Sequence, residues 1–149
     1  MRLWLICLVS FACGCFHTAY AASDKIIKVL PHYLDLEGRH SISPSLYDRD
    51  AYQARLRKNP KERSGLRFDI QWRARAASAP RLRVEVRGAK GKDLTQSVLE
   101  TSGQPGAFSK WTVLTLSGDA YQKFGELAAW RATLWDGEKL LSEQKSFLW

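Results

Sequence analysis

Residues 65–76 read GLRFDIQWRARA, and apolar and polar side chains alternate strictly along this stretch. Successive side chains of a β-strand project to opposite faces, so a period of two is typical of a strand with one buried face. The side chains on the apolar side are Leu66, Phe68, Ile70, Trp72 and Ala74. The pattern therefore predicts a strand whose apolar face contributes to the core of a β-sheet protein.

Similar segments follow along the chain. The further strands that we expect are 81–87, 95–100, 111–116, 128–135 and 140–149, the last ending the protein. In the strand 128–135, Ala128 and Trp130 are expected on the inward side, and Trp72 and Trp130 are the expected core tryptophans. Turn signals occupy 88–91, 102–106 and the hairpin dipeptide Asp136-Gly137.

The region before residue 65 has a different character. We expect an opening strand over 25–36, followed by a short helix that Asp48 or Asp50 caps and that runs to Lys58. Tyr52 and Leu56 lie one turn apart on one face of that helix. A second helical turn is expected over 119–127. The sequence predicts a single domain over 22–149, in which 22–64 packs on a sandwich core formed by 65–149.

About seven short strands with turns between them predict an antiparallel β-sandwich with one short helix in the N-terminal third. From its strand spacing and its closing hairpin, 128–149, the chain resembles the immunoglobulin-like and fibronectin type III-like superfamily over residues 65–149. The immunoglobulin-type cysteine pair is absent. The resemblance implies adhesion, recognition or structural support, and it implies no catalytic residue.

The beginning of the chain predicts export. A 14-residue apolar run follows Arg2 and is shorter than the ~20 residues that a membrane-spanning helix needs. With the small residues Ala19 and Ala21 after it, the run is typical of a signal peptide, 1–21, cleaved between Ala21 and Ala22. This predicts a periplasmic or extracellular protein with no transmembrane segment in the mature chain. A lipoprotein anchored through Cys15 is the alternative.

The residues offer little chemistry for a reaction. The three cysteines all lie in the expected leader, which excludes a disulfide framework or a cysteine zinc site in the body. We interpret His32 as a packed strand residue and His40 as part of a solvated turn. Nucleophile-elbow, zinc-protease and phosphate-loop motifs are absent. We therefore expect a protein that is not an enzyme and that uses no metal or cofactor, with a carboxylate-based hydrolase as a distant alternative.

Positive charge is the most informative surface feature. After Arg2 is removed with the leader, 22 basic and 15 acidic residues remain, a net charge of +7. Such a field attracts polyanions, and arginine adds bidentate contacts to phosphate, sulfate or carboxylate. The candidate ligand-binding residues, on outward strand positions, are Arg73, Arg81, Arg83, Arg87, Arg131 and Trp135. The alternative interpretation is a solvated outer face whose arginine stems cover the sheet.

Together these patterns predict a small exported protein that acts as a non-catalytic binding or structural module. The expected partner is an anionic envelope glycan or lipid, captured on an arginine-rich strand face, or an envelope protein; an exported protein is not expected to bind nucleic acid. The alternative is a scaffold subunit of an envelope assembly that pairs through its C-terminal strand.

Overall fold

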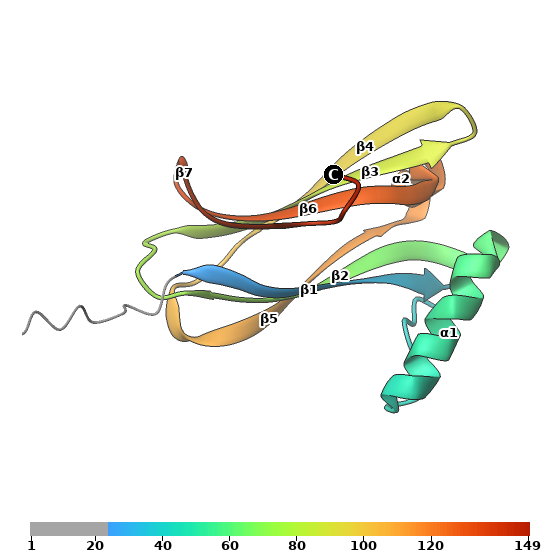
Figure 1. Ribbon diagram of the computed structural model, residues 1–149, viewed down its shortest axis with the longest axis horizontal. Coiled ribbons are helices and arrows are strands. Elements are labelled where there is room, and N and C mark those ends of the chain that lie inside the picture. Colours follow the sequence, from blue (N-terminus) through green and yellow to red (C-terminus); the bar gives the residue numbers. More distant parts are fainter. Residues whose placement is uncertain (1–23) are drawn as a thin grey trace, which may run out of the picture.

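Seven antiparallel strands form two sheets that pack face to face in the computed structural model, which describes residues 24–149 (Figure 1). The strands are β1 (Lys25–Asp35), β2 (Arg63–Ala74), β3 (Pro80–Lys90), β4 (Asp93–Ser102), β5 (Gly106–Ser117), β6 (Glu126–Asp136) and β7 (Lys139–Lys145). One sheet has the order β1-β2-β5 and the other β4-β3-β6-β7. The predicted mainly-β sandwich is confirmed, and it is compatible with an immunoglobulin-like fold. The predicted cleavage position and Cys15 lie outside the described residues.

Strand β2 is the centre of the three-stranded sheet and carries much of the core. All five side chains predicted to point inward from it are almost completely buried. They pack against the inward side chains of β3, where Leu82, Val84 and Val86 are equally buried. The alternation in the sequence is thus the alternation between the core and the outer face of each sheet.

Strand β3 is longer than predicted. It runs to Lys90, so the expected turn over 88–91 is wrong for its first three residues. Gly88 is a buried strand residue, and only glycine fits there, because a Cβ atom would lie 2.7 Å from the Phe124 ring. The turn itself begins at Gly91, which has a φ of +65°.

A register shift in β6 changes which of its side chains face the core. Arg87 pairs with Ala129, but the next residue of β3, Gly88, pairs with Leu127. The residue between them, Ala128, is skipped and is exposed, so its predicted inward position is wrong. Trp130 lies opposite Val86 and packs half-buried against the core.

Two helices cover the ends of the strands. Helix α1 (Leu46–Lys58) stands crosswise at one end of the three-stranded sheet, and α2 (Gly118–Phe124) connects the two sheets (Figure 1). Ser45 caps α1, since its Oγ accepts a hydrogen bond from the Asp48 backbone N–H, so the prediction of an aspartate cap is wrong. Tyr52 and Leu56 are buried as predicted. A single 3-10 turn, Pro60–Glu62, follows α1.

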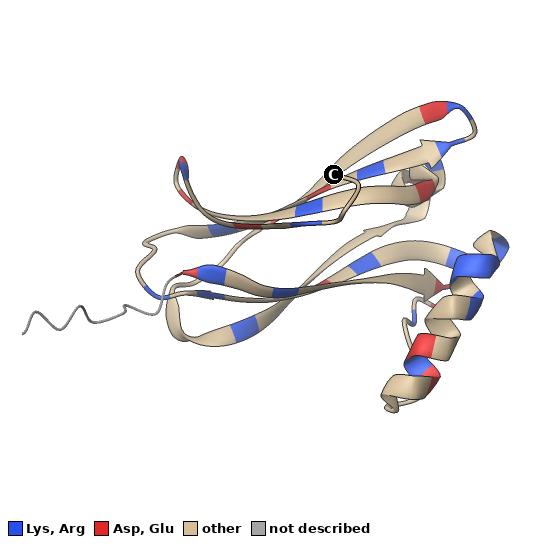
Figure 2. Ribbon diagram, viewed as in Figure 1, with Lys and Arg blue, Asp and Glu red and all other residues tan. Residues whose placement is uncertain are grey.

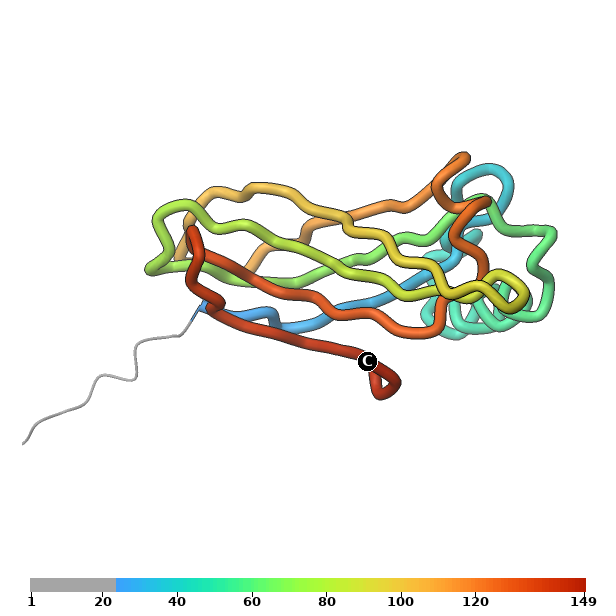
Figure 3. Tube along the Cα trace, turned by 90° about the horizontal axis from the view of Figure 1, so that it is seen from above, coloured from blue at the N-terminus to red at the C-terminus, as the bar shows by residue number. Residues whose placement is uncertain are grey.

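The C-terminal hairpin closes one side of the sandwich. Asp136 is still a strand residue, and Gly137, with a φ of +57°, begins the turn. Strand β7 then runs beside β1 (Figure 3), where Ser142 Oγ accepts a hydrogen bond of 3.0 Å from the Ile26 N–H. Because β7 ends at Lys145, the return strand is shorter than the predicted 140–149. The last residues turn back, with the Trp149 N–H donating to the Ser146 carbonyl.

Candidate functional site

Most of the predicted ligand-binding residues lie together on the outer face of the four-stranded sheet. The β3–β6 register places Arg81 opposite Trp135 and Glu85 opposite Arg131. We call the outer surface formed by Arg81, Arg83, Arg87 and Arg131 the arginine face. Arg73 belongs to β2 in the other sheet and is not part of it. Figure 2 shows basic residues on both sheets and on α1.

Three glutamates from neighbouring strands interleave with these arginines. Glu100 on β4 accepts a 2.7 Å hydrogen bond from Arg83 and lies 3.5 Å from Arg81. Arg131 lies between Glu85, at 3.1 Å, and Glu143, at 3.5 Å. Glu100 and Glu143 could not be assigned as partners from the sequence, because the register of β4 and β7 decides which acids reach the arginine face. Exposed ion pairs of this kind each contribute no more than about 1 kcal/mol.

Arg87 has a different environment from its three neighbours. Its guanidinium carbon lies 3.9 Å from the centroid of the Trp149 ring, and that of Arg131 lies 5.7 Å from the same ring. Within residues 24–149, no carboxylate lies within 4 Å of Arg87. A guanidinium stacked on an indole keeps N–H donors at its edge for an anion. No local sequence pattern indicates this contact, because it depends on the turn after β7.

Trp135 is half-buried at the other end of the arginine face. Its indole nitrogen is enclosed and donates no hydrogen bond within the described chain. Trp149 is half-buried as well, but it is the tryptophan whose ring lies against Arg87 and Arg131.

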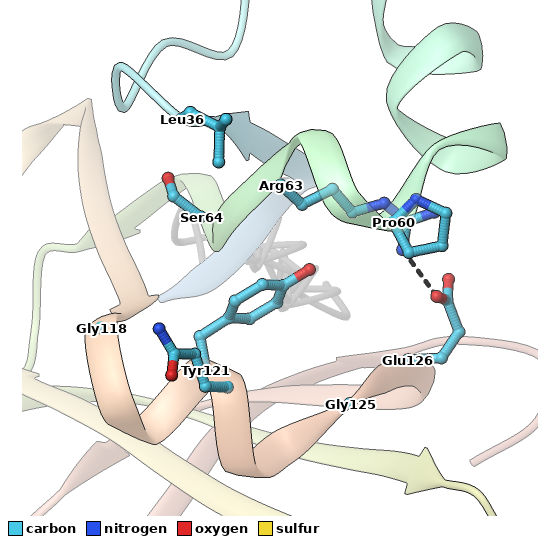
Figure 4. Close-up of a pocket in the computed structure, with 9 residues that line it drawn as sticks. Leu36, Pro60, Arg63, Ser64, Gly118, Tyr121, Gly125 and Glu126 are labelled. Carbon is cyan, nitrogen blue, oxygen red and sulfur yellow. Dashed lines mark hydrogen bonds and ion pairs between the residues drawn. The ribbon is translucent and has the colours of Figure 1, made fainter.

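A concave region lies between the start of β2 and α2 and is shown in Figure 4. This cavity has a volume of about 450 Å³, and Arg63, Tyr121 and Glu126 line it together with Pro60 and Ser64. Arg63 stands at the start of β2, and only 1% of its side chain is exposed. Its guanidinium donates a 2.6 Å hydrogen bond to Glu126.

The remaining polar atoms around Arg63 are also paired. The guanidinium donates to the carbonyls of Leu56 and Arg57 at the end of α1, and it lies 4.0 Å from the centroid of the Tyr33 ring. The Tyr33 hydroxyl donates a 2.7 Å hydrogen bond to Glu126. Burial raises the pKa of Tyr33, and the bond to Glu126 raises it further.

The residues that line this cavity hold the end of α1 against the strands. Burial raises the pKa of Tyr121 as well, so both phenols stay protonated at neutral pH and neither serves as a base. The Ser64 hydroxyl donates to the Asp35 carbonyl, which leaves it without a base to activate it. Arg63 therefore connects the end of α1 to β1 and β6, and the residues around it lack the pairing that nucleophilic catalysis needs.

His32 and His40, the two histidines among residues 24–149, lie side by side, with ring centroids 5.2 Å apart. His32 is buried, as predicted, and its Nε2 lies 3.5 Å from Asp69. Burial lowers the pKa of His32 to about 4, which keeps the ring neutral at pH 7 although Asp69 acts in the opposite direction. Among residues 24–149, no three His, Cys, Asp or Glu side chains are close enough together to hold a metal ion.

Comparisons with known proteins and a search for membrane-spanning helices both gave negative results. No family model, no curated protein and no solved structure matches it. Within the described residues, no helix combines the length and the apolar character that crossing a membrane requires.

Proposed function

We propose that this protein is a non-catalytic binding module that holds anionic ligands on the arginine face, at the corner formed by Arg87 and Trp149. The ligand class is an exported or envelope-associated glycan or lipid headgroup that carries phosphate or sulfate groups. The observation that carries the proposal is the environment of Arg87. Its guanidinium stacks on Trp149 without an acidic partner, whereas Arg81, Arg83 and Arg131 each lie beside a glutamate.

The charge of the surrounding surface supports the same ligand class. Five cations, Arg81, Arg83, Arg87, Arg131 and Lys145, share the outer face of this sheet with Glu85, Glu100 and Glu143. The excess positive charge attracts a polyanion from a distance, and Arg87 supplies a donor that no internal pair competes for. Arg131 lies near the same indole and would provide the second contact.

We further propose that the module belongs to the fibronectin type III branch of the immunoglobulin-like superfamily and reaches its ligand by export. In the constant-type immunoglobulin fold, the fourth strand pairs with the fifth. Here β4 pairs with β3 and the three-stranded sheet is β1-β2-β5. Modules of this architecture serve recognition and support, which is consistent with a binding role.

The test compares binding to dextran sulfate and to phosphatidylglycerol vesicles for the wild type, Arg87→Gln and Trp149→Ala. We expect each variant to bind at least tenfold more weakly, and wild-type binding to weaken steeply between 20 and 150 mM salt, at roughly the ionic strengths where screening becomes strong. Arg73→Gln is the matched control, since it removes the same charge from the other sheet. An equal loss for Arg73→Gln and Arg87→Gln would show that only net charge matters and would overturn the assignment.

A scaffold role is the second candidate, and the end of the chain favours it. Phe147 is fully exposed and Leu148 is 72% exposed, directly after the edge strand β7. A partner strand added beside β7 would extend the four-stranded sheet, and Phe147 and Leu148, just beyond the end of β7, would offer the same partner an apolar contact. In a pull-down from envelope extract, this role predicts a partner that stays bound at high salt and is lost for Phe147→Ser/Leu148→Ser, a variant that keeps Trp149.

A further inference from the structure

A depression on the outer face of the three-stranded sheet lies far from the arginine face, on the opposite side of the sandwich. It has a volume of about 440 Å³, and residues of β1, β2 and β5 form its floor. The beginning of α1 forms one wall, because this helix projects beyond the outer face of the sheet (Figure 1). Neither the proposed anion site nor the cavity at Arg63 includes any of its residues.

Trp111 gives this depression an aromatic surface. The register places Trp111 opposite Gln71 and Val113 opposite Asp69, so both side chains point outward on the edge strand β5. The Trp111 side chain is 52% exposed, and Val113 and Leu46 extend the apolar surface around it. A half-exposed indole in a concave site provides a flat face on which a pyranose ring can stack.

The charges around this surface are positive and only partly neutralised. Arg67 is paired with Asp69 through hydrogen bonds of 2.8 and 2.9 Å. Arg49, on the wall, has a buried Nε without a hydrogen-bond partner, and the nearest carboxylate oxygen, on Asp50, lies 3.9 Å away. Lys28 on β1 forms no ion pair within residues 24–149. Two cations thus remain available to an anionic group in the depression.

We propose that this depression binds a hexuronate unit of an acidic saccharide. The pyranose ring stacks on Trp111. The carboxylate of the sugar accepts hydrogen bonds from Arg49 and forms an ion pair with Lys28. This combination selects a sugar that carries a carboxylate over a neutral sugar, because only the former makes charge-assisted contacts with Arg49 and Lys28. The site is independent of the proposed function, since it recognises the shape of one sugar unit and lies on the other sheet.

The test is calorimetric titration of the wild-type protein with trigalacturonate and with maltotriose, which is neutral. We expect trigalacturonate to bind at least tenfold more tightly than maltotriose. Trp111→Ala and Arg49→Gln should each weaken trigalacturonate binding at least tenfold, while Trp111→Phe, which keeps an aromatic face, should lose less. Phe108→Ala, on the same strand, and Arg57→Gln, on the same helix, are the matched controls, because neither residue lines the depression.

Three results would overturn the proposal: no trigalacturonate binding at millimolar concentration, equal binding of both saccharides, or Trp111→Ala binding as the wild type does. Unchanged circular dichroism spectra and thermal midpoints for the variants separate lost binding from lost folding. Arg87→Gln distinguishes the two sites. It should weaken dextran sulfate binding and leave trigalacturonate binding intact, so either site can fail without the other.

Discussion

Burial controls the charge of His32, and this gives the fold a defined pH response. The folded-state pKa is about 4, below the ordinary value of 6.5, because burial disfavours the charged ring, while Asp69 opposes and His40, Arg49 and Arg67 add to the effect. Between these two pH values the unfolded chain binds the proton and the folded chain does not. The stabilisation is therefore complete above pH 6.5 and is lost as the pH falls toward 4.

We expect this residue to reduce the free energy of unfolding by up to about 3 kcal/mol between pH 7 and pH 4. Urea denaturation at several pH values measures the effect. His32→Asn should have a flatter profile over this window than the wild type and than His40→Asn. A wild-type profile that is already flat would contradict the assigned burial.

Gly103 lies so close to Trp72 that a methyl group has no room. A Cβ atom built on Gly103 would come within 2.4 Å of the indole, and Trp72 is itself completely buried. We expect Gly103→Ala to lower the free energy of unfolding by about 1–3 kcal/mol through overpacking. Gly106→Ala, at the start of β5, is the matched control, because nothing lies within 4 Å of its Cβ position. Equal urea midpoints for the two variants would contradict this packing.

At the scale of elements, the start of α1 depends on Ser45. Its Oγ accepts the hydrogen bond from the Asp48 N–H at 3.4 Å, in an exposed position. We expect Ser45→Ala to cost about 0.5–1 kcal/mol, near the lower end for lost helix caps. Asp50→Ala, which removes an exposed carboxylate from the same turn, should change stability less. Thermal unfolding followed by circular dichroism compares the two variants, and a larger loss for Asp50→Ala would restore the aspartate as the cap.

The sequence predicted the existence of the elements well and their register poorly. Strict alternation in β2 requires only that one face be buried, so its inward residues could be named without any knowledge of its partners. The register shift that turns Ala128 outward depends on pairing between β3 and β6, and it cannot be predicted from the local sequence. The turn after β7, which brings Trp149 to Arg87, is equally non-local.

The candidate site, too, could be predicted from the sequence only in part. Outward arginines were predictable from the period of two, but sheet membership was not, so Arg73 was grouped with residues that lie on the other sheet. Glu100 and Glu143, which neutralise three of the arginines, come from β4 and β7, and the sequence does not determine the order of these strands. Likewise, Arg49 and Trp111 are 62 positions apart in the chain, and only the placement of α1 at the end of the three-stranded sheet brings them to one depression.

At the scale of the whole molecule, one buried arginine, Arg63, connects helix α1 to a strand of each sheet. Arg63 links the last carbonyls of α1 to Glu126 at the start of β6, and its guanidinium covers the Tyr33 ring of β1. It thereby connects the helix to both sheets. Glu126 is 52% exposed and can regain water when the pair is broken, whereas the Leu56 carbonyl is buried and would lose its partner.

We expect Arg63→Met to lower the free energy of unfolding by about 3 kcal/mol, because removing one member of a buried pair leaves buried polar atoms unsatisfied. Arg55→Met is the matched control: its ion pair with Glu62 measures 3.1 Å, but its side chain is 56% exposed, so its loss should cost less than about 1 kcal/mol. In Arg63→Met, amide hydrogen exchange should become faster in α1 and stay unchanged in the two sheets. The helix loses its connection to the strands, while the core between the sheets keeps its packing. Equal losses for the two variants, or unchanged exchange in α1, would mean that the buried residues Tyr52, Gln53 and Leu56 hold the helix without Arg63.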